Sequence, residues 1–103
     1  MSQDTKRDRV WKTILELESE PPEYTLYRTG GAPDTIVGFT KADIQATVGD
    51  EISKRTIHDV VLTMVEYGLL KMVKEPSYAS ISPHPITGDR VQADVYRMDN
   101  DER

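Results

Sequence analysis

The sequence contains no cysteine and no long run of apolar residues, and both absences exclude whole classes of protein. Without cysteine there can be no disulfide framework, no thiolate zinc site and no cysteine nucleophile. The apolar runs are only a few residues long, as at residues 60–62, whereas a membrane-spanning helix needs about 20. No apolar stretch follows the basic residues near the N-terminus, so no secretory signal is expected. We therefore expect a soluble cytoplasmic protein with no membrane association.

Motifs for catalysis and for cofactor binding are also missing. The two histidines, His58 and His84, lie far apart and have no neighbouring cluster of carboxylates, so no metal site is predicted. Asp50 and Glu51 are neighbours on a predicted turn, whereas general acid–base catalysis needs two groups that converge on one cleft. There is no glycine-rich phosphate loop, no nucleophile elbow and no His-Glu-x-x-His motif. The sequence predicts neither an enzyme nor a cofactor.

The chain is short and acidic. Its 103 residues give room for one domain, which we expect to span residues 1–103. Lys and Arg total 13 against 18 Asp and Glu, a net charge of −5 that disfavours indiscriminate binding to nucleic acid. Residues 39–74, however, contain five basic and five acidic residues, so this segment has no net charge. The negative charge therefore lies in the flanking segments, and a local basic face remains compatible with the net value.

The N-terminal part of the chain is predicted to form a helix over residues 5–19. Apolar residues recur with helical spacing from Val10 to Leu17, and Thr5 and Asp8 have the spacing of a capping box. Residues 20–39 are rich in proline and glycine, which excludes a long regular element. Short strands at residues 24–27 and 35–37 and a plain surface connection both remain open for this segment.

Two further helices are predicted between residues 40 and 68. Thr40 and Asp43 form a second capping box, which begins a short helix that ends at Gly49. Ser53 is a good N-cap for a longer helix that Gly68 ends, and its apolar residues follow the strongest helical pattern in the chain. The sequence therefore predicts two consecutive helices separated by a turn.

The C-terminal third of the chain is predicted to form a long β-hairpin. Residues 69–74 and 91–98 read as its two strands, and the proline-rich residues 75–90 between them read as an irregular tip. Residues 99–103 form a charged tail. Together with the helices, these strands predict an α+β domain.

Two short segments resemble the winged helix-turn-helix family of DNA-binding domains. They are residues 52–57, Ile-Ser-Lys-Arg-Thr-Ile, and residues 64–70, Met-Val-Glu-Tyr-Gly-Leu-Leu. Members commonly begin the recognition helix with hydrophobic-Ser-x-x-Thr-hydrophobic and leave it through Leu-Glu-x-x-Gly-Leu-hydrophobic. Residues 96–98, Tyr-Arg-Met, are similar to the end of a second wing strand. The resemblance implies three helices with a long β-hairpin wing, a helix-turn-helix over 40–68 and a wing over 69–98.

The chain departs from the commonest family pattern in the turn between its second and third helices. In the family pattern, the turn glycine directly precedes the hydrophobic residue that comes before the capping serine. In this sequence, Asp50 and Glu51 separate Gly49 from Ile52. This turn is two residues longer and carries two more negative charges.

The resemblance implies that the helix beginning near Ser53 enters the major groove of double-stranded DNA, whose width of about 12 Å accepts one α-helix. The residues expected to contact DNA are Thr40, Lys41, Ser53, Lys54, Arg55, Thr56, His58, Lys74 and Arg90. Asp59 is a further candidate, as an acceptor toward cytosine, and Lys71 and His84 are secondary candidates on the wing. The basic residues of the first helix, Lys6, Arg7, Arg9 and Lys12, are expected mainly to face solvent.

Aromatic residues outside this motif have structural interpretations. Trp11 is expected in the core or at a dimer seam, and Tyr24, Tyr27 and Tyr78 are expected in hairpin packing.

The expected function is that of a sequence-specific transcriptional regulator that binds a pseudo-palindromic DNA site as a homodimer. The alternative is an acidic winged-helix module that binds another protein and not DNA. The high Asp and Thr content and the presence of only six lysines resemble proteins of haloarchaea, whose cytoplasm holds molar salt. A haloarchaeal regulator is therefore expected to depend less on simple phosphate attraction.

Overall fold

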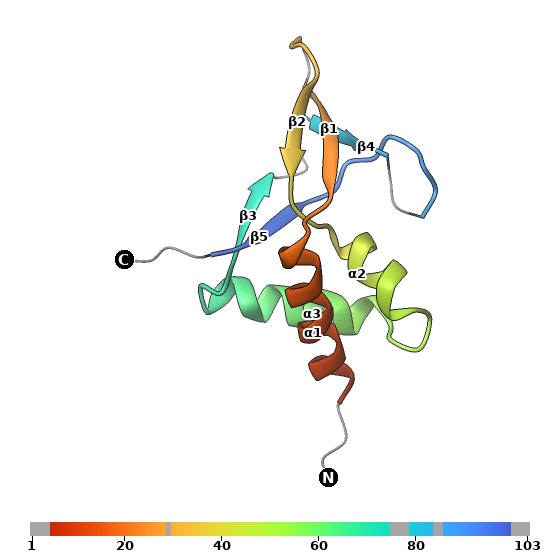
Figure 1. The fold of residues 1–103 in the computed structure, drawn as a ribbon, viewed down its shortest axis with the longest axis vertical. Coiled ribbons are helices and arrows are strands. Elements are labelled where there is room, and N and C mark those ends of the chain that lie inside the picture. Colours follow the sequence, from red (N-terminus) through yellow and green to blue (C-terminus); the bar gives the residue numbers. More distant parts are fainter. Residues whose placement is uncertain (1–4, 29, 75–78, 84–85, 100–103) are drawn as a thin grey trace.

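The computed structural model describes residues 5–28, 30–74, 79–83 and 86–99, which form three helices and two small antiparallel sheets (Figure 1). The elements in chain order are α1 (Lys6–Ser19), β1 (Glu23–Arg28), β2 (Asp34–Val37), α2 (Lys41–Val48), α3 (Lys54–Glu66), β3 (Leu70–Lys74), β4 (Ala79–Ser82) and β5 (Val95–Met98). The expected α+β class is confirmed. No helix in the described ranges is long and apolar enough to cross a bilayer.

Each helix begins at the cap that the sequence predicts. In α1 the Thr5 hydroxyl accepts the Asp8 N–H at 3.0 Å, and the Asp8 carboxylate accepts the Thr5 N–H at 3.3 Å. Thr40 and Asp43 make the same reciprocal pair at the start of α2. Ser53 accepts an N–H from the first turn of α3 at 3.2 Å. These contacts satisfy N–H groups that have no partner inside the helix. Because each cap bonds to a residue three positions away, the sequence predicts where the three helices begin.

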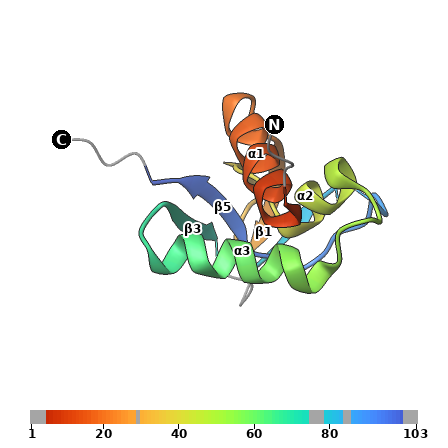
Figure 2. The same cartoon turned by 90° about the horizontal axis from the view of Figure 1, so that it is seen from below.

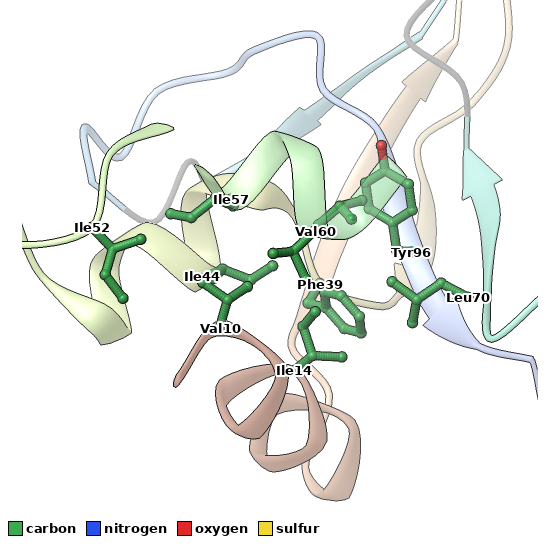
Figure 3. Packing of buried hydrophobic residues seen from close by; sticks show 10 residues of the cluster. Val10, Ile14, Phe39, Ile44, Ile52, Ile57, Val60, Leu70 and Tyr96 are labelled. Atoms are coloured by element: carbon green, nitrogen blue, oxygen red, sulfur yellow. The ribbon is translucent and has the colours of Figure 1, made fainter. Parts of the chain in front are cut away.

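The three helices enclose one hydrophobic core, and α1 crosses the middle of α3 (Figures 1 and 2). The buried members of this core come from all three helices, from the segments flanking α2 and from the β3–β5 sheet (Figure 3). They are Val10, Ile14, Phe39, Ile44, Ile52, Ile57, Val60, Val61, Leu70 and Tyr96. Trp11 packs against this core and stays partly exposed.

The predicted pairing of the strand after α3 with the C-terminal strand is confirmed. β3 and β5 are antiparallel, with Leu70 opposite Met98 and Met72 opposite Tyr96, and an irregularity in the register lies between Met72 and Lys74. The second strand is shorter than the predicted 91–98, because regular pairing with β3 covers only β5.

The proline-rich segments form a second sheet that the sequence only partly predicted. The short strands expected at 24–27 and 35–37 are confirmed, since β1 and β2 pair as an antiparallel hairpin. β4, however, comes from the expected irregular tip and pairs with β1, where Leu26 lies opposite Ile81. The tip is therefore not a plain extension of the β3–β5 hairpin. Burial of Leu26 and Ile81 in a second core, with Tyr24 and Val95, gives the physical reason.

β5 joins the two cores because successive residues of a strand point to opposite sides. Val95 packs in the core of the three-stranded sheet, and Tyr96 packs in the core of the helices. Phe39, just before α2, bridges to Tyr96 through two backbone hydrogen bonds of 3.0 and 2.8 Å. Gly38 permits this approach, because a Cβ built there would lie 2.6 Å from a Val95 methyl and 2.7 Å from the Tyr96 carbonyl oxygen.

A buried carboxylate ties the three-stranded sheet to α2. The Tyr24 hydroxyl donates to Asp43 Oδ2, and the same oxygen accepts the Thr40 N–H at 2.9 Å and the Thr40 hydroxyl at 3.2 Å. Burial, together with the adjacent Asp43 carboxylate, raises the pKa of Tyr24 well above its ordinary value. The neutral phenol is therefore held as a donor to the carboxylate.

An ion pair fixes the end of α1 to β5. Both Arg97 Nε and Nη2 donate to the Glu18 carboxylate, at 3.1 and 3.0 Å, and the Met98 N–H donates to it at 3.2 Å. Burial opposes ionisation of Glu18, but these hydrogen bonds and the charges of Arg97 and Lys71 hold its pKa below the ordinary value. The paired geometry orients α1 against the β3–β5 sheet.

Replacing Tyr24 with Phe is expected to lower the free energy of unfolding by about 1–3 kcal/mol, because the buried Asp43 carboxylate loses a donor. Denaturation in urea at pH 7 measures this change. Tyr67→Phe is the control, since Tyr67 is 76% exposed and should leave stability unchanged. Equal effects of the two substitutions would contradict the assigned role of Tyr24.

Stability is also expected to fall as the pH rises through about 10. The unfolded chain releases the Tyr24 proton near that pH, whereas the folded chain retains it because its pKa is raised. Tyr96 has a raised pKa for the same main reason, burial, with Asp94 as its neighbour. Tyr24→Phe should therefore reduce the slope of unfolding free energy against pH between 9 and 11 without abolishing it; an unchanged slope would refute this linkage.

Candidate nucleic-acid interface

The first turn of α3 presents a group of polar and basic side chains at the surface. Ser53, Lys54, Arg55 and His58 are exposed, and Thr56 is half-buried. α3 places these residues outward because Ile57, Val60 and Val61 occupy its opposite face, in the core. The structure therefore brings together all five residues predicted on this helix.

Two side chains define the long turn between α2 and α3. The Gln45 amide donates to the carbonyls of Gly49 and Ile52, each at 2.8 Å, and so closes the turn from inside. Gly49 has a φ of +86°, a left-handed conformation that favours glycine. Arg9 of α1 donates to Glu51 at 3.1 Å, which offsets one of the two additional negative charges. The extended turn thus has a defined structure and is less acidic than its sequence indicates.

Lys41, at the start of α2, lies beside the basic turn of α3. Its Nζ is 3.1 Å from His58 Nδ1. A lysine ammonium has donors only, so His58 Nδ1 is the acceptor in this contact. The contact places basic groups from two helices side by side.

An open hollow of about 310 Å³ lies beside this contact, between the first turns of α2 and α3. Ile86, from the segment between β4 and β5, forms its third side. The residues that line it include Lys41, Ala42, Lys54, Ile57, His58 and Ile86.

Other predicted contacts lie elsewhere. Thr40 is only 2% exposed, and its hydroxyl is engaged with Asp43, so this side chain caps α2 and does not reach the surface. Arg90 lies against the three-stranded sheet: Nε donates to Ser80 at 2.7 Å, and the guanidinium carbon is 4.3 Å from the centroid of the Tyr27 ring. Arg90 is therefore held by neighbours that the sequence did not indicate.

The remaining candidates are dispersed or undescribed. Lys71 is exposed on β3 and Asp59 is half-buried on α3. On α1, Lys6, Arg7 and Lys12 are exposed, whereas Arg9 pairs with Glu51. His84, Tyr78 and residues 100–103 lie outside the described residues, and so does the side chain of Lys74. In the described part of the chain, no three His, Cys, Asp or Glu side chains gather as a metal site would require.

Sequence reasoning missed Gln45, Ile86 and the Arg9–Glu51 pair. A glutamine in a helix has no local signal for contacts with carbonyls of the following turn. Ile86 lies in a segment without periodicity, so its position beside α2 and α3 follows only from the tertiary path of the chain. A count of charges along the sequence also could not show that Glu51 has a basic partner on α1.

Ser53→Ala is expected to lower the free energy of unfolding by about 1 kcal/mol, because it removes the oxygen that caps α3. Urea denaturation checks this. Ser53→Asp keeps an acceptor at the same position and should retain most of the stability. A loss with Ser53→Asp as large as that with Ser53→Ala would show that the cap is not the cause.

No family model matches the sequence, and neither a curated protein nor a solved structure matches it. Its function is therefore inferred from the side chains gathered at the start of α3.

Proposed function

We propose that this protein is a winged helix-turn-helix transcriptional regulator that inserts the N-terminal part of α3 into the major groove of double-stranded DNA. The observation that carries the proposal is the exposure of Lys54, Arg55 and His58 on the first turn of a helix whose other face is buried. Such a turn offers donors to base edges and phosphates, and the helix N-terminus itself favours a negative group.

The arrangement of elements supports this reading. α2 and α3 follow each other through one turn, α1 packs on both, and β3, which pairs with β5, comes directly after α3. In a helix-turn-helix the second helix reads the groove while the preceding helix crosses the backbone. Lys41, at the start of α2 and in contact with His58, is suitably placed for a phosphate.

The distribution of charge limits which part of α3 approaches DNA. Past the first turn, the helix carries Asp59 and the exposed Glu66, with Leu62, 46% exposed, between them. Carboxylates are repelled by phosphates, whereas the cations lie at the N-terminal end. We infer that only the first turns of α3 enter the groove.

In this proposal the protein binds DNA as a homodimer, on two half-sites about 34–36 Å apart, a spacing that matches one turn of DNA. Trp11 and the exposed Leu15, on the same helix, supply apolar surface for the contact between subunits. If the cytoplasm holds molar salt, where the Debye length is about 3 Å, recognition rests on base contacts and shape more than on net charge.

A second candidate function is that of a protein-interaction module without DNA binding. Leu62 favours it, because this exposed apolar side chain lies between two acidic residues, Asp59 and Glu66, in the middle of the outward part of α3. An acidic surface with an exposed leucine suits a basic partner protein better than a nucleic acid.

Selection from a random pool of DNA duplexes, carried out at 0.1 M and at 2 M KCl, tests the proposal directly. We expect an enriched motif with two-fold symmetry in at least one of the two salts, because a dimer reads two equivalent half-sites. Absence of an enriched motif in both salts would favour the protein-interaction module.

Arg55→Ala is expected to weaken binding to the selected duplex by about 5- to 150-fold, which corresponds to about 1–3 kcal/mol, and to relax the preference at one base position. Lys54→Gln should weaken binding more evenly across sequences and reduce its dependence on salt. Fluorescence anisotropy measures both effects. Lys6→Gln, an exposed lysine of α1, is the matched control and should bind as the wild type does. Unchanged affinity and preference with Arg55→Ala would remove Arg55 from the reading surface.

A further inference from the structure

The hollow between α2 and α3 differs from an ordinary surface depression in its lining, which combines apolar walls with basic side chains. Its volume of about 310 Å³ is at the lower end of the range of small-molecule sites, which is about 300–1,000 Å³. Ala42, Ile57 and Ile86 give it apolar walls that come from three separate segments. Ile86 is 58% exposed although it lies beside this hollow, so an apolar group bound there would cover carbon surface that now faces water.

The charged groups at the hollow are all basic. Lys41 and Lys54 bring two ammonium groups from two helices, and no Asp or Glu is among the described residues that line it. His58, 3.1 Å from Lys41, carries no negative charge that would offset the lysines. An anion is the ligand that would balance this site.

We propose that the hollow binds a small organic anion, with its phosphate or carboxylate group beside Lys41 and Lys54 and its apolar body against Ile86 and Ala42. A backbone phosphate of DNA would use the same cations but would not need the apolar walls. This difference separates the two sources of a bound anion. The regulatory consequence rests on the proposed function: because Lys41 and Lys54 are also proposed to contact DNA, the ligand and the duplex compete.

Calorimetric titration of the full chain with phenyl phosphate and with inorganic phosphate, in low salt at pH 7.5, tests this site. Phenyl phosphate should bind about tenfold more tightly than inorganic phosphate, since burial of roughly 55 Å² of apolar surface gives that ratio. Equal affinity for the two probes, or binding of neither below about 10 mM, would overturn the proposal.

Three variants locate the binding site. Ile86→Ser should remove the preference for phenyl phosphate while leaving inorganic phosphate unaffected, and Lys41→Gln should weaken both probes by about fivefold or more. Lys6→Gln is the control and should leave both affinities unchanged. Thermal unfolding of each variant verifies its fold. A full preference for phenyl phosphate in folded Ile86→Ser would show that the apolar wall is not used.

A competition arm separates this proposal from the DNA-binding one. Phenyl phosphate should displace the selected duplex from the wild type but not, at the same concentration, from Ile86→Ser. Tight DNA binding without any phenyl phosphate binding would refute the small-molecule site and leave the proposed DNA function standing. Phenyl phosphate binding with the predicted variant pattern, but no enriched DNA motif, would support the site while the proposed DNA function fails.

Discussion

The position of α2, and with it the surface at the start of α3, depends on one buried carboxylate. Asp43 Oδ2 receives the Thr40 N–H, the Thr40 hydroxyl and the Tyr24 hydroxyl. Two of these donors set the first turn of α2, and the third comes from β1 of the three-stranded sheet. A carboxylate that is only 8% exposed is costly unless such donors surround it, so the sheet and the helix must meet in one orientation. α2 in turn packs on α3, and this packing brings Lys41 to His58.

β5 explains how so small a chain holds two cores. Its alternating residues Val95 and Tyr96 face the three-stranded sheet and the helices respectively. Glu18 fixes the end of α1 to the same strand through Arg97. Every helix packs on the core to which Tyr96 belongs. β5 therefore links the core of the helices to the core of the three-stranded sheet. The proline-rich segments, which contribute little helical structure, are thereby given a packing role.

The charge of −5 is distributed in a way that a sum does not reveal. Lys41, Lys54 and His58 gather at one corner of the helices, while Glu51 is paired with Arg9. The proposed DNA contact and the proposed anion site both use this corner. The two proposals are compatible because basic groups at a helix N-terminus attract a phosphate whether it belongs to a polymer or to a small molecule.

The sequence by itself determined the helices, because capping and helical periodicity act between residues three or four apart: Thr5, Thr40 and Ser53 mark the three starts. It also determined the pairing of β3 with β5 and the candidate residues on the first turn of α3. Only the tertiary structure decided that β4 pairs with β1, that Thr40 is buried, and that Arg90 lies on Tyr27. The hollow beside Ile86 was likewise settled only by tertiary packing. The physical reason is that these contacts join residues distant in sequence, and the burial that drives them has no local pattern.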